Sequence, residues 1–330
     1  MHNKETELKR MQRSRSILNL FQVHEFSIFI VLAVIFVALS ISSTDAFLTV
    51  SNILNVLNQA SITFIMAAGM TLVIILGGID LSIGYVMSLS GIVVCQLMTQ
   101  GHLPIWLAII ATLGIGALIG LINGLVISKL GVVEFITTLA MMLICHGITY
   151  SWTGGYPIIN LPSEFMFFGQ GKVLGVRVPI WIALVVFLVV NVMLNRFKLG
   201  TQLYATGGNK EAARLSGINV DRMKIFVHVV CSFCGAMAGI LMASRLATGQ
   251  PNAGDSYSYD VIGGAILGGT SPSGGVGKVY GTLIGVLIFS FITNGLTILN
   301  VNFYMQEIIK GGVILVALAI NAYRQKKMTR

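Results

Sequence analysis

Long apolar segments, interrupted by short polar ones, run along the chain from Phe26 to Tyr323. A helix needs about 20 mostly apolar residues to cross the hydrocarbon core of a bilayer. The pattern therefore predicts an all-α integral membrane protein with about ten transmembrane helices. A single membrane domain, 26–323, is expected between tails at 1–25 and 324–330. The predicted spans are 26–42, 53–76, 82–100, 104–128, 132–152, 178–197, 224–245, 258–272, 279–298 and 304–323.

Three of these assignments have alternatives. Segment 258–272 is short and rich in glycine, so a broken helix covered by protein is the alternative to a full span. The connection 153–177 is long enough to hold a re-entrant piece. A basic stretch precedes Phe26–Leu39, as it does in signal peptides, but no small-x-small cleavage pattern follows, which favours a retained span.

The composition agrees with a membrane protein. Hydrophobic residues make up 55% of the chain and charged residues 10%, whereas soluble domains average about 25% charged residues. So few polar groups cannot cover a soluble surface of this size, and the apolar content is too high for intrinsic disorder. The net charge of +9 is more simply explained by basic loops on one side of a membrane than by a nucleic-acid partner.

The basic residues predict the orientation. With the N-terminal tail in the cytoplasm, ten spans return the C-terminal tail to the same side, and 17 of the 21 Lys and Arg residues then fall on cytoplasmic segments. Lys172, Arg177 and Arg245 remain outside, and Lys310 lies inside the last span. This bias predicts that both termini are cytoplasmic.

Catalytic and metal-binding patterns do not emerge from the sequence. The four cysteines, Cys95, Cys145, Cys231 and Cys234, lie in apolar segments and are expected to be small packing residues. The stretch Gly274–Lys278 resembles a phosphate loop, but Pro272 occupies its first glycine position and Val279 replaces the Ser or Thr. We therefore expect no enzyme activity, no metal and no cofactor bound by this chain.

Two segments carry glycine at every fourth position, which places the glycines on one helix face and lets backbones approach closely. Packing inside one subunit and a seam between subunits are both compatible with the spacing. The glycines are Gly116, Gly120 and Gly124 in the first segment, and Gly277, Gly281 and Gly285 in the second.

The segment 198–223 is the longest polar stretch between two predicted spans. Asn209 has the side chain of a helix N-cap, Glu211 follows near the positive end of the helix, and Gly217 is a natural stop. The sequence thus predicts a short helix over 210–216.

Two alanines give this short helix a candidate docking face. Ala212 and Ala213 are expected to be exposed and to leave a small, flat surface that fits a groove of another protein. The alternative is an ordinary surface loop that contains one helical turn.

The stretch Gly77–Gly84 interrupts two apolar runs with polar residues. Asp80 and Ser82 either cap the following span or belong to a broken helix that presents polar groups to a solute pathway. Charge within spans is costly and often functional, which draws attention to Glu134 and to the pair Glu307 and Lys310, whose spacing allows an ion pair on one helix.

Several motifs, in order along nearly the whole chain, resemble the membrane permease subunit of ribose-type ABC sugar importers. They are Gly77–Gly84 (GGIDLSIG), Gly116–Gly124 (GALIGLING), Phe135–Leu139 (FITTL), Gly207–Val220 (GGNKEAARLSGINV), Ser244–Leu246 with Pro251, Leu267–Gly275 (LGGTSPSGG), Gly281–Gly285 and Asn294–Leu296.

The resemblance implies a permease of the vitamin-B12-importer (type II) architecture, located in the bacterial cytoplasmic membrane. It implies alternating access for a monosaccharide, such as a ribose-like pentose, driven by a separate ATPase that binds ATP and Mg. The expected partners are a second permease subunit, identical or paralogous, the cytoplasmic ATPase, a periplasmic or lipid-anchored sugar-binding protein, and membrane lipid.

The resemblance also assigns residues. The segment 209–220 is similar to the family's coupling helix, and the expected ATPase-coupling residues are Asn209, Glu211, Ala212, Ala213, Arg214, Ser216, Gly217 and Ile218. The expected lining of the translocation path is Asp80, Ser82, Asn123, Thr137, Thr138 and Asn294.

The chain departs from the family's pattern at a few positions. Glu134 stands where the family commonly has Pro, Ser258-Tyr259-Asp260 replaces Glu-Leu-Asp, and Ser271-Pro272 is an unusual form of its loop. The alternative functions are a secondary sugar carrier or channel that works without an ATPase, and a membrane scaffold that moves no solute.

Overall fold

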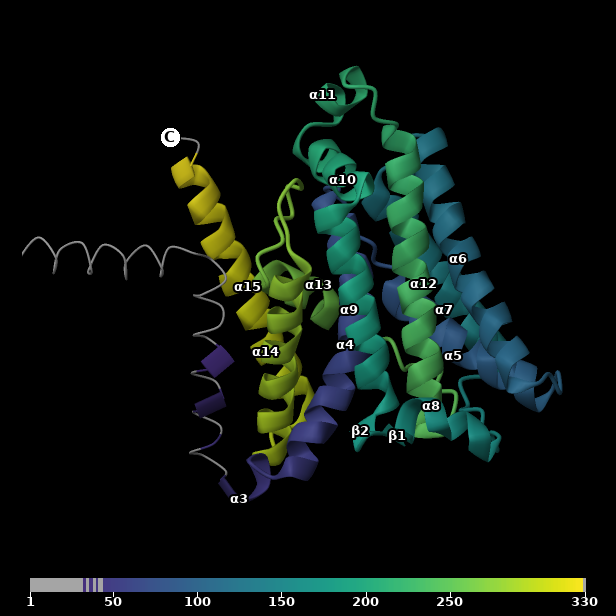
Figure 1. Cartoon of the computed structure of the whole chain (residues 1–330). Helices are drawn as coiled ribbons and strands as arrows, with labels where there is room; N and C mark the ends of the chain where they lie inside the picture. The colour runs from purple at the N-terminus through teal and green to yellow at the C-terminus, as the bar shows by residue number, and fades with distance from the viewer. Residues whose placement is uncertain (1–31, 34–35, 38–39, 41–43, 329–330) are drawn as a thin grey trace, which may run out of the picture.

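The computed structural model describes residues 32–33, 36–37, 40 and 44–328, and it is built almost entirely of helices (Figure 1). Helices lie at nine of the ten predicted spans, and the first predicted span, 26–42, falls mostly outside the described residues. In chain order the main helices are α4 (Val50–Ile75), α5 (Ile83–Thr99), α6 (Ile105–Lys129), α7 (Glu134–Thr153), α9 (Val178–Arg196), α12 (Val220–Leu246), α13 (Tyr257–Leu267), α14 (Val279–Ile298) and α15 (Phe303–Met328).

Smaller elements connect these helices. Helix α3 (Thr44–Phe47) precedes α4, and α10 (Lys198–Gly208) and α11 (Lys210–Leu215) lie between α9 and α12. The connection 153–177 holds a 3₁₀ turn (Ser163–Met166), α8 (Phe167–Gln170) and an antiparallel hairpin of β1 (Lys172–Val173) and β2 (Val176–Arg177). Buried Phe165 and a hydrogen bond from the Gly169 amide to Ser244 Oγ (2.7 Å) fix this connection on the end of α12.

Six helices in the described part of the chain are long and apolar enough to cross a membrane: α4, α6, α7, α9, α12 and α14. Helix α5 is apolar but shorter. At the predicted span 258–272 the structure favours the broken-helix alternative, because the helix there, α13, ends at Leu267. Its 11 residues extend about 17 Å at 1.5 Å per residue, whereas a bilayer core is about 30 Å thick.

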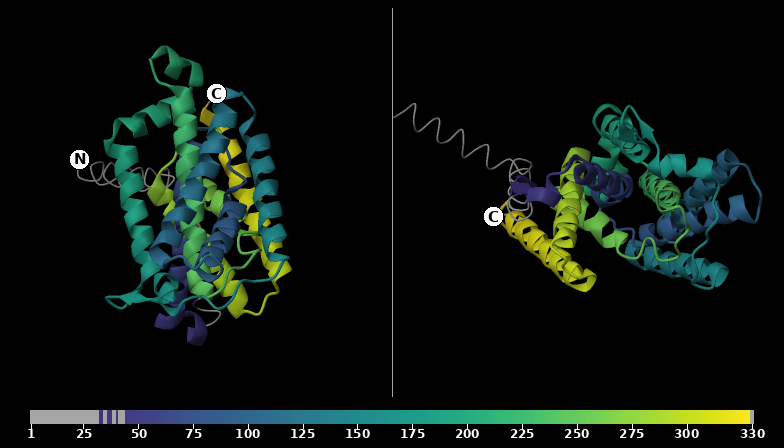
Figure 2. Two further views of the ribbon diagram at one scale, coloured as in Figure 1. Left: turned by 90° about the vertical axis from the view of Figure 1, so that its right-hand side faces the viewer. Right: turned by 90° about the horizontal axis from the view of Figure 1, so that it is seen from below.

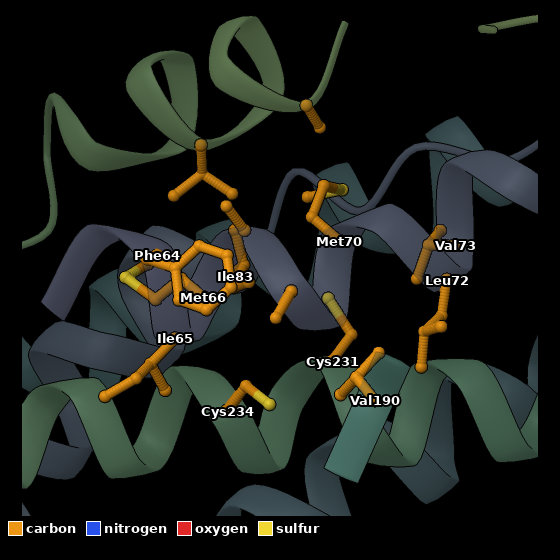
Figure 3. Packing of buried hydrophobic residues seen from close by; sticks show 14 of the residues in the cluster. Phe64, Ile65, Met66, Met70, Leu72, Val73, Ile83, Val190, Cys231 and Cys234 are labelled. Atoms are coloured by element: carbon orange, nitrogen blue, oxygen red, sulfur yellow. The ribbon is translucent and has the colours of Figure 1, made fainter. Parts of the chain in front are cut away.

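Helix α4 is the centre of the bundle, and it packs against α9, α12, α13 and α14. Figure 3 shows Ile65 of α4 on the side of α12, towards Cys234, and Phe64 and Met66 on the other side of α4, all four of them buried. Contact is close here, since a Cβ on Gly69 would lie 2.9 Å from the Cα of Cys231. All four cysteines are buried and free, as expected for packing residues.

The most buried helix is not the most hydrophobic one. The most apolar stretch of α4 is 94% buried and has a mean hydropathy of 1.6. The corresponding stretch of α6 is 28% buried with a mean hydropathy of 2.5, and that of α9 is 22% buried with a mean hydropathy of 2.4. The helices with the highest hydropathy thus expose most of their surface, as expected where the surrounding solvent is lipid.

Candidate functional site

Helix α11 projects beyond the membrane helices at one end of the bundle, with α10 beneath it, and α15 also ends at this end (Figure 1). Asn209 separates α10 from α11, and its Oδ1 accepts hydrogen bonds from the amides of Glu211 and Ala212, both at 3.0 Å. This confirms the predicted N-cap. Gly217 follows with φ +80°, a conformation that favours glycine, so the chain turns sharply there towards α12.

The outer surface of α11 differs from the prediction at one position. Ala212 is exposed, but Ala213 is buried at 3% exposure and faces the protein. The most prominent side chain is Leu215, which is 90% exposed and was not among the predicted residues. A leucine at the tip of a short helix is an apolar projection suited to a pocket of a partner protein, and Glu211 and Arg214 pair beside it at 2.9 Å.

Helix α10 supports α11 and was missed in the sequence, because its three glycines and two threonines disfavour a helix. Tertiary contacts hold it in place. Tyr204 donates a hydrogen bond to the carbonyl of Gly277 (2.7 Å), and burial raises the pKa of this hydroxyl, which keeps it protonated as a donor.

Four glycines join α10 to the membrane helices, and we call Gly77, Gly207, Gly274 and Gly275 the glycine junction. A Cβ on Gly207 would lie 1.8 Å from the carbonyl oxygen of Ile75, and a Cβ on Gly274 would lie 3.1 Å from the Cα of Gly77. The amide of Gly275 donates to the same Ile75 carbonyl at 2.8 Å. Three of the motifs noted in the sequence therefore meet here in direct backbone contact.

A buried polar network lies near this junction. Asp80 Oδ1 accepts hydrogen bonds from the amide of Ser82 (2.9 Å) and from its hydroxyl (2.5 Å). Asp80 Oδ2 lies 3.2 Å from Nδ1 of His228, and Asn123 Nδ2 donates to Ser82 Oγ at 3.2 Å. All four side chains are fully buried. The structure thus brings together Asp80, Ser82 and Asn123, and adds His228 of α12, which had not been predicted.

The network retains unused hydrogen-bonding capacity. Within the described residues, Asn123 Oδ1 and His228 Nε2 are buried without a hydrogen-bond partner. Ser82 occupies the N-cap position of α5, but its side chain makes no capping bond, and Asp80 bonds to Ser82 itself rather than to α5. The structure therefore does not support the capping interpretation, because the side chains of Asp80 and Ser82 bond within the network instead.

The remaining residues predicted to line the path lie in different places. Thr137 and Thr138 are buried on α7, where Thr138 Oγ1 lies 3.3 Å from the carbonyl of Ile79 beside Asp80. Asn294 is separate, because its amide exchanges two hydrogen bonds with Asn52 at the start of α4, at 3.0 and 2.9 Å. The structure therefore does not bring Asn294 to the Asp80 network.

Glu134 lies between the coupling segment and the membrane helices. Its Oε1 is 4.0 Å from Nζ of Lys210 in α11 and 3.9 Å from Nζ of Lys224 in α12. These three side chains, with Gly78 and Pro272, line a cavity of about 380 Å³. The sequence showed the charge but not its partners, which are 76 and 90 positions further along the chain.

A second charge pair differs from the one that the sequence spacing allowed. Lys310 does not pair with Glu307 of its own helix. Its Nζ lies 3.0 Å from Asp260 Oδ2, and this ion pair connects α15 to α13. Near α11, Lys129 pairs with Asp221 at 3.2 Å, which joins the end of α6 to the start of α12.

The glycine stripes pack inside the subunit. Gly116, Gly120 and Gly124 all lie against α12, and a Cβ on Gly120 would be 2.3 Å from the carbonyl oxygen of His228. Gly281 and Gly285 lie against the backbone of Gly268 and Gly264. Gly277 is not part of this helix face, because α14 begins only at Val279.

A helical membrane bundle with a buried polar network, joined to a projecting helix with an exposed apolar tip, is typical of a membrane transport subunit. Residues 52–318 match the model of the family described as branched-chain amino acid transport system / permease component. The match covers most of the chain, including α11 and the network, and the chain belongs to this family.

Individual relatives are similar over nearly their full length. The chain is 42% identical to the ribose import permease protein RbsC of Escherichia coli (strain K12) over 88% of this chain and 92% of that protein. It is 44% identical to RbsC of Haemophilus influenzae over 92% and 96%. It is 37% identical to the galactose/methyl galactoside import permease protein MglC of Salmonella typhimurium, again over 92% and 96%. No solved structure matches the chain significantly.

Proposed function

We propose that this chain is the transmembrane permease subunit of an ATP-binding-cassette importer, and that it carries a monosaccharide, a ribose-like pentose or a related sugar, across the cytoplasmic membrane. The names of its relatives, which are import permeases for ribose and for galactose or methyl galactoside, support this choice of substrate class. Buried hydroxyl, amide and carboxylate groups inside an apolar bundle are also suited to a polar, uncharged solute.

Energy is supplied by a partner in this proposal. A cytoplasmic ATPase, which binds ATP and Mg, docks on α11, and this chain binds no cofactor. The observation that carries the proposal is the glycine junction, because it gives α11 a rigid mechanical connection to the loops beside the Asp80 network. When the ATPase closes on nucleotide and displaces α11, the helix bundle switches the side to which its pathway opens.

The proposal also covers the membrane topology of the chain and its other partners. The chain forms ten spans of the vitamin-B12-importer type with both termini in the cytoplasm, pairs with a second permease subunit, and receives sugar from a periplasmic or lipid-anchored binding protein. Lys198 begins α10, Lys210 and Arg214 belong to α11, and Lys129 pairs with Asp221 at the start of α12, so the end of the molecule that carries α11 is basic, which favours placing this end on the cytoplasmic side.

Purification of the tagged chain from its native membranes tests the proposal. We expect an ATPase subunit to purify with it in a stoichiometric amount. Gly217→Pro should abolish this association and sugar uptake, because proline holds φ near −65° and lacks the amide that donates to Arg214 O at 2.9 Å. Gly217→Asn is the matched control, since asparagine tolerates positive φ.

Three results would contradict the proposal. Sugar uptake by the purified chain alone, sensitive to an ion gradient, would indicate a secondary carrier or channel. Stable partners without any solute flux would indicate a scaffold. Normal uptake by the Gly217→Pro variant would show that α11 does not couple the ATPase to transport.

A further inference from the structure

A second group of aromatic and polar side chains, none of them a member of the Asp80 network, gathers on the membrane part of the molecule. They are Tyr85 of α5, His146 and Tyr150 of α7, Tyr259 of α13, and Asp255 in the turn before α13. The ring centroids of Tyr85 and His146 are 4.9 Å apart, and those of His146 and Tyr150 are 4.5 Å apart. Asp255 lies close enough to Tyr85 and Tyr150, and Tyr259 close enough to Tyr85, for these groups to influence one another electrostatically.

This aromatic-acidic cluster is accessible. Tyr259 is 61% exposed, Asp255 is also exposed, and the other three side chains are partly exposed. A carboxylate that faced lipid at this depth would be costly, so polar groups within membrane segments normally face a water-filled path or another protein. The exposure of Asp255 therefore favours a surface that water and solute reach.

The backbone beneath the cluster is held firmly. The amide of Gly84 donates to Ser258 Oγ at 3.1 Å, and the amide of Gly254 donates to Ser88 Oγ at 2.8 Å, so the start of α13 is fixed to α5. On its other side α13 is fixed to α15 by the ion pair of Asp260 and Lys310. Figure 2 shows α7 and α15 on the same side of the molecule, with α13 between them.

Helix α13 is only about half as long as a bilayer core is thick, and the loop after its last turn reaches the glycine junction at the α10–α11 end of the bundle, so its first turn lies deeper in the bundle. Transporters commonly place their solute site at such a discontinuous helix near the midplane. A cluster at the first turn of α13 is therefore well placed to meet a solute in transit.

The chemistry of the cluster matches a sugar. A monosaccharide presents hydroxyl groups, which donate and accept hydrogen bonds, together with an apolar face of C–H groups. Asp255 accepts hydrogen bonds, the tyrosine hydroxyls and the His146 ring donate and accept them, and the aromatic faces offer apolar surface with a partial negative charge. Ligand sites generally combine apolar and aromatic walls with a few polar groups in this way.

We infer that Tyr85, His146, Tyr150, Asp255 and Tyr259 form a contact site for a monosaccharide in the translocation path. This inference rests on the proposed function and deepens it, because it places substrate selectivity in the permease itself. Tyr259 and Asp255 are the determining residues, since they are the most exposed members of the cluster and come from the same segment.

Uptake measurements with D-ribose, D-allose and D-galactose test the inference. The full chain is produced with its ATPase and binding protein in cells that lack other routes for these sugars. Asp255→Asn and Tyr259→Ala should each lower uptake of the preferred sugar about tenfold or more, because a hydrogen bond to a charged group or an aromatic contact is lost. Tyr259→Phe should have a smaller effect and should change the ratio among the three sugars.

The controls separate this result from a folding defect and from failure of the proposed function. Tyr156→Ala removes a similarly exposed tyrosine from the connection after α7 and should leave uptake unchanged. Co-purification of the ATPase in parental amounts shows that a variant is folded and assembled. Uptake within twofold of the parent by both Asp255→Asn and Tyr259→Ala, at unchanged sugar ratios, would overturn the site. A parent that carries none of these sugars would instead contradict the proposed function.

Discussion

Two adjacent glycines at the end of α10 allow a matched test of the glycine junction. Gly207→Ala places a methyl group 1.8 Å from the carbonyl oxygen of Ile75 and 2.7 Å from the amide nitrogen of Gly275. Both contacts are with backbone atoms, so no side-chain rotation relieves them. Gly208→Ala, one residue later in the same helix, meets no atom within 4 Å.

The expected cost follows from three effects. Overpacking costs about 1–3 kcal/mol, and displacing α10 also strains or breaks the hydrogen bond from the Gly275 amide to Ile75, which is worth about 1 kcal/mol. Alanine regains about 0.5–1 kcal/mol in a helix relative to glycine. We therefore expect Gly207→Ala to destabilise the protein by about 2 kcal/mol, and Gly208→Ala to be neutral or slightly stabilising.

Thermal unfolding in detergent, monitored by the loss of monodisperse protein, measures the difference between the two variants. Gly207→Ala should unfold at a temperature several degrees below the parent and should also lose sugar uptake, because α11 would no longer move with the loops near Asp80. Gly208→Ala should retain both properties. Equal unfolding temperatures and normal uptake in both variants would refute the idea that backbone contact at this junction links α10 to the membrane helices.

Three further substitutions have defined outcomes. Leu215→Asp should leave the folded chain intact, because the side chain is 90% exposed. The variant should nevertheless lose the ATPase during purification. Retention of the ATPase would argue against docking at this tip. Asp80→Ala should destabilise the protein by roughly 2–4 kcal/mol, since it leaves buried groups of Ser82 and His228 without their partner. Asp80→Asn should retain most of the stability in the same unfolding assay. Gly120→Ala should separate α6 from α12 and lower the unfolding temperature, whereas Gly114→Ala on the same helix, with no atom within 4 Å, should raise it slightly.

The helices were the most predictable part of the structure. Apolar segments of about 20 residues directly reflect the thickness of a bilayer, and helices lie at nine of the predicted positions within the described residues. The cap at Asn209 and the stop at Gly217 were also predictable, because both depend on local side-chain and backbone chemistry.

The site was less predictable, because its partners are distant in sequence. Asp80 could be noted from the sequence, but nothing local indicates that His228, 148 positions later, lies beside it. The spacing of Glu307 and Lys310 allowed an ion pair on one helix, but Lys310 pairs instead with Asp260 of another helix. Helix α10 contradicts its own intrinsic propensity and exists through contacts with Ile75 and Gly277.

The position of α4 has a consequence for how this protein is made. Its packing partners α9, α12, α13 and α14 all follow it in the sequence, and the first of them begins at Val178, about 100 residues after α4 ends. During synthesis α4 therefore enters the membrane before any of these partners exists, with Asn58 and Thr71 still in contact with lipid or the insertion machinery. An unfinished chain would expose these polar groups, whereas the completed protein buries them. This difference gives the cell a feature by which to recognise and degrade unfinished chains.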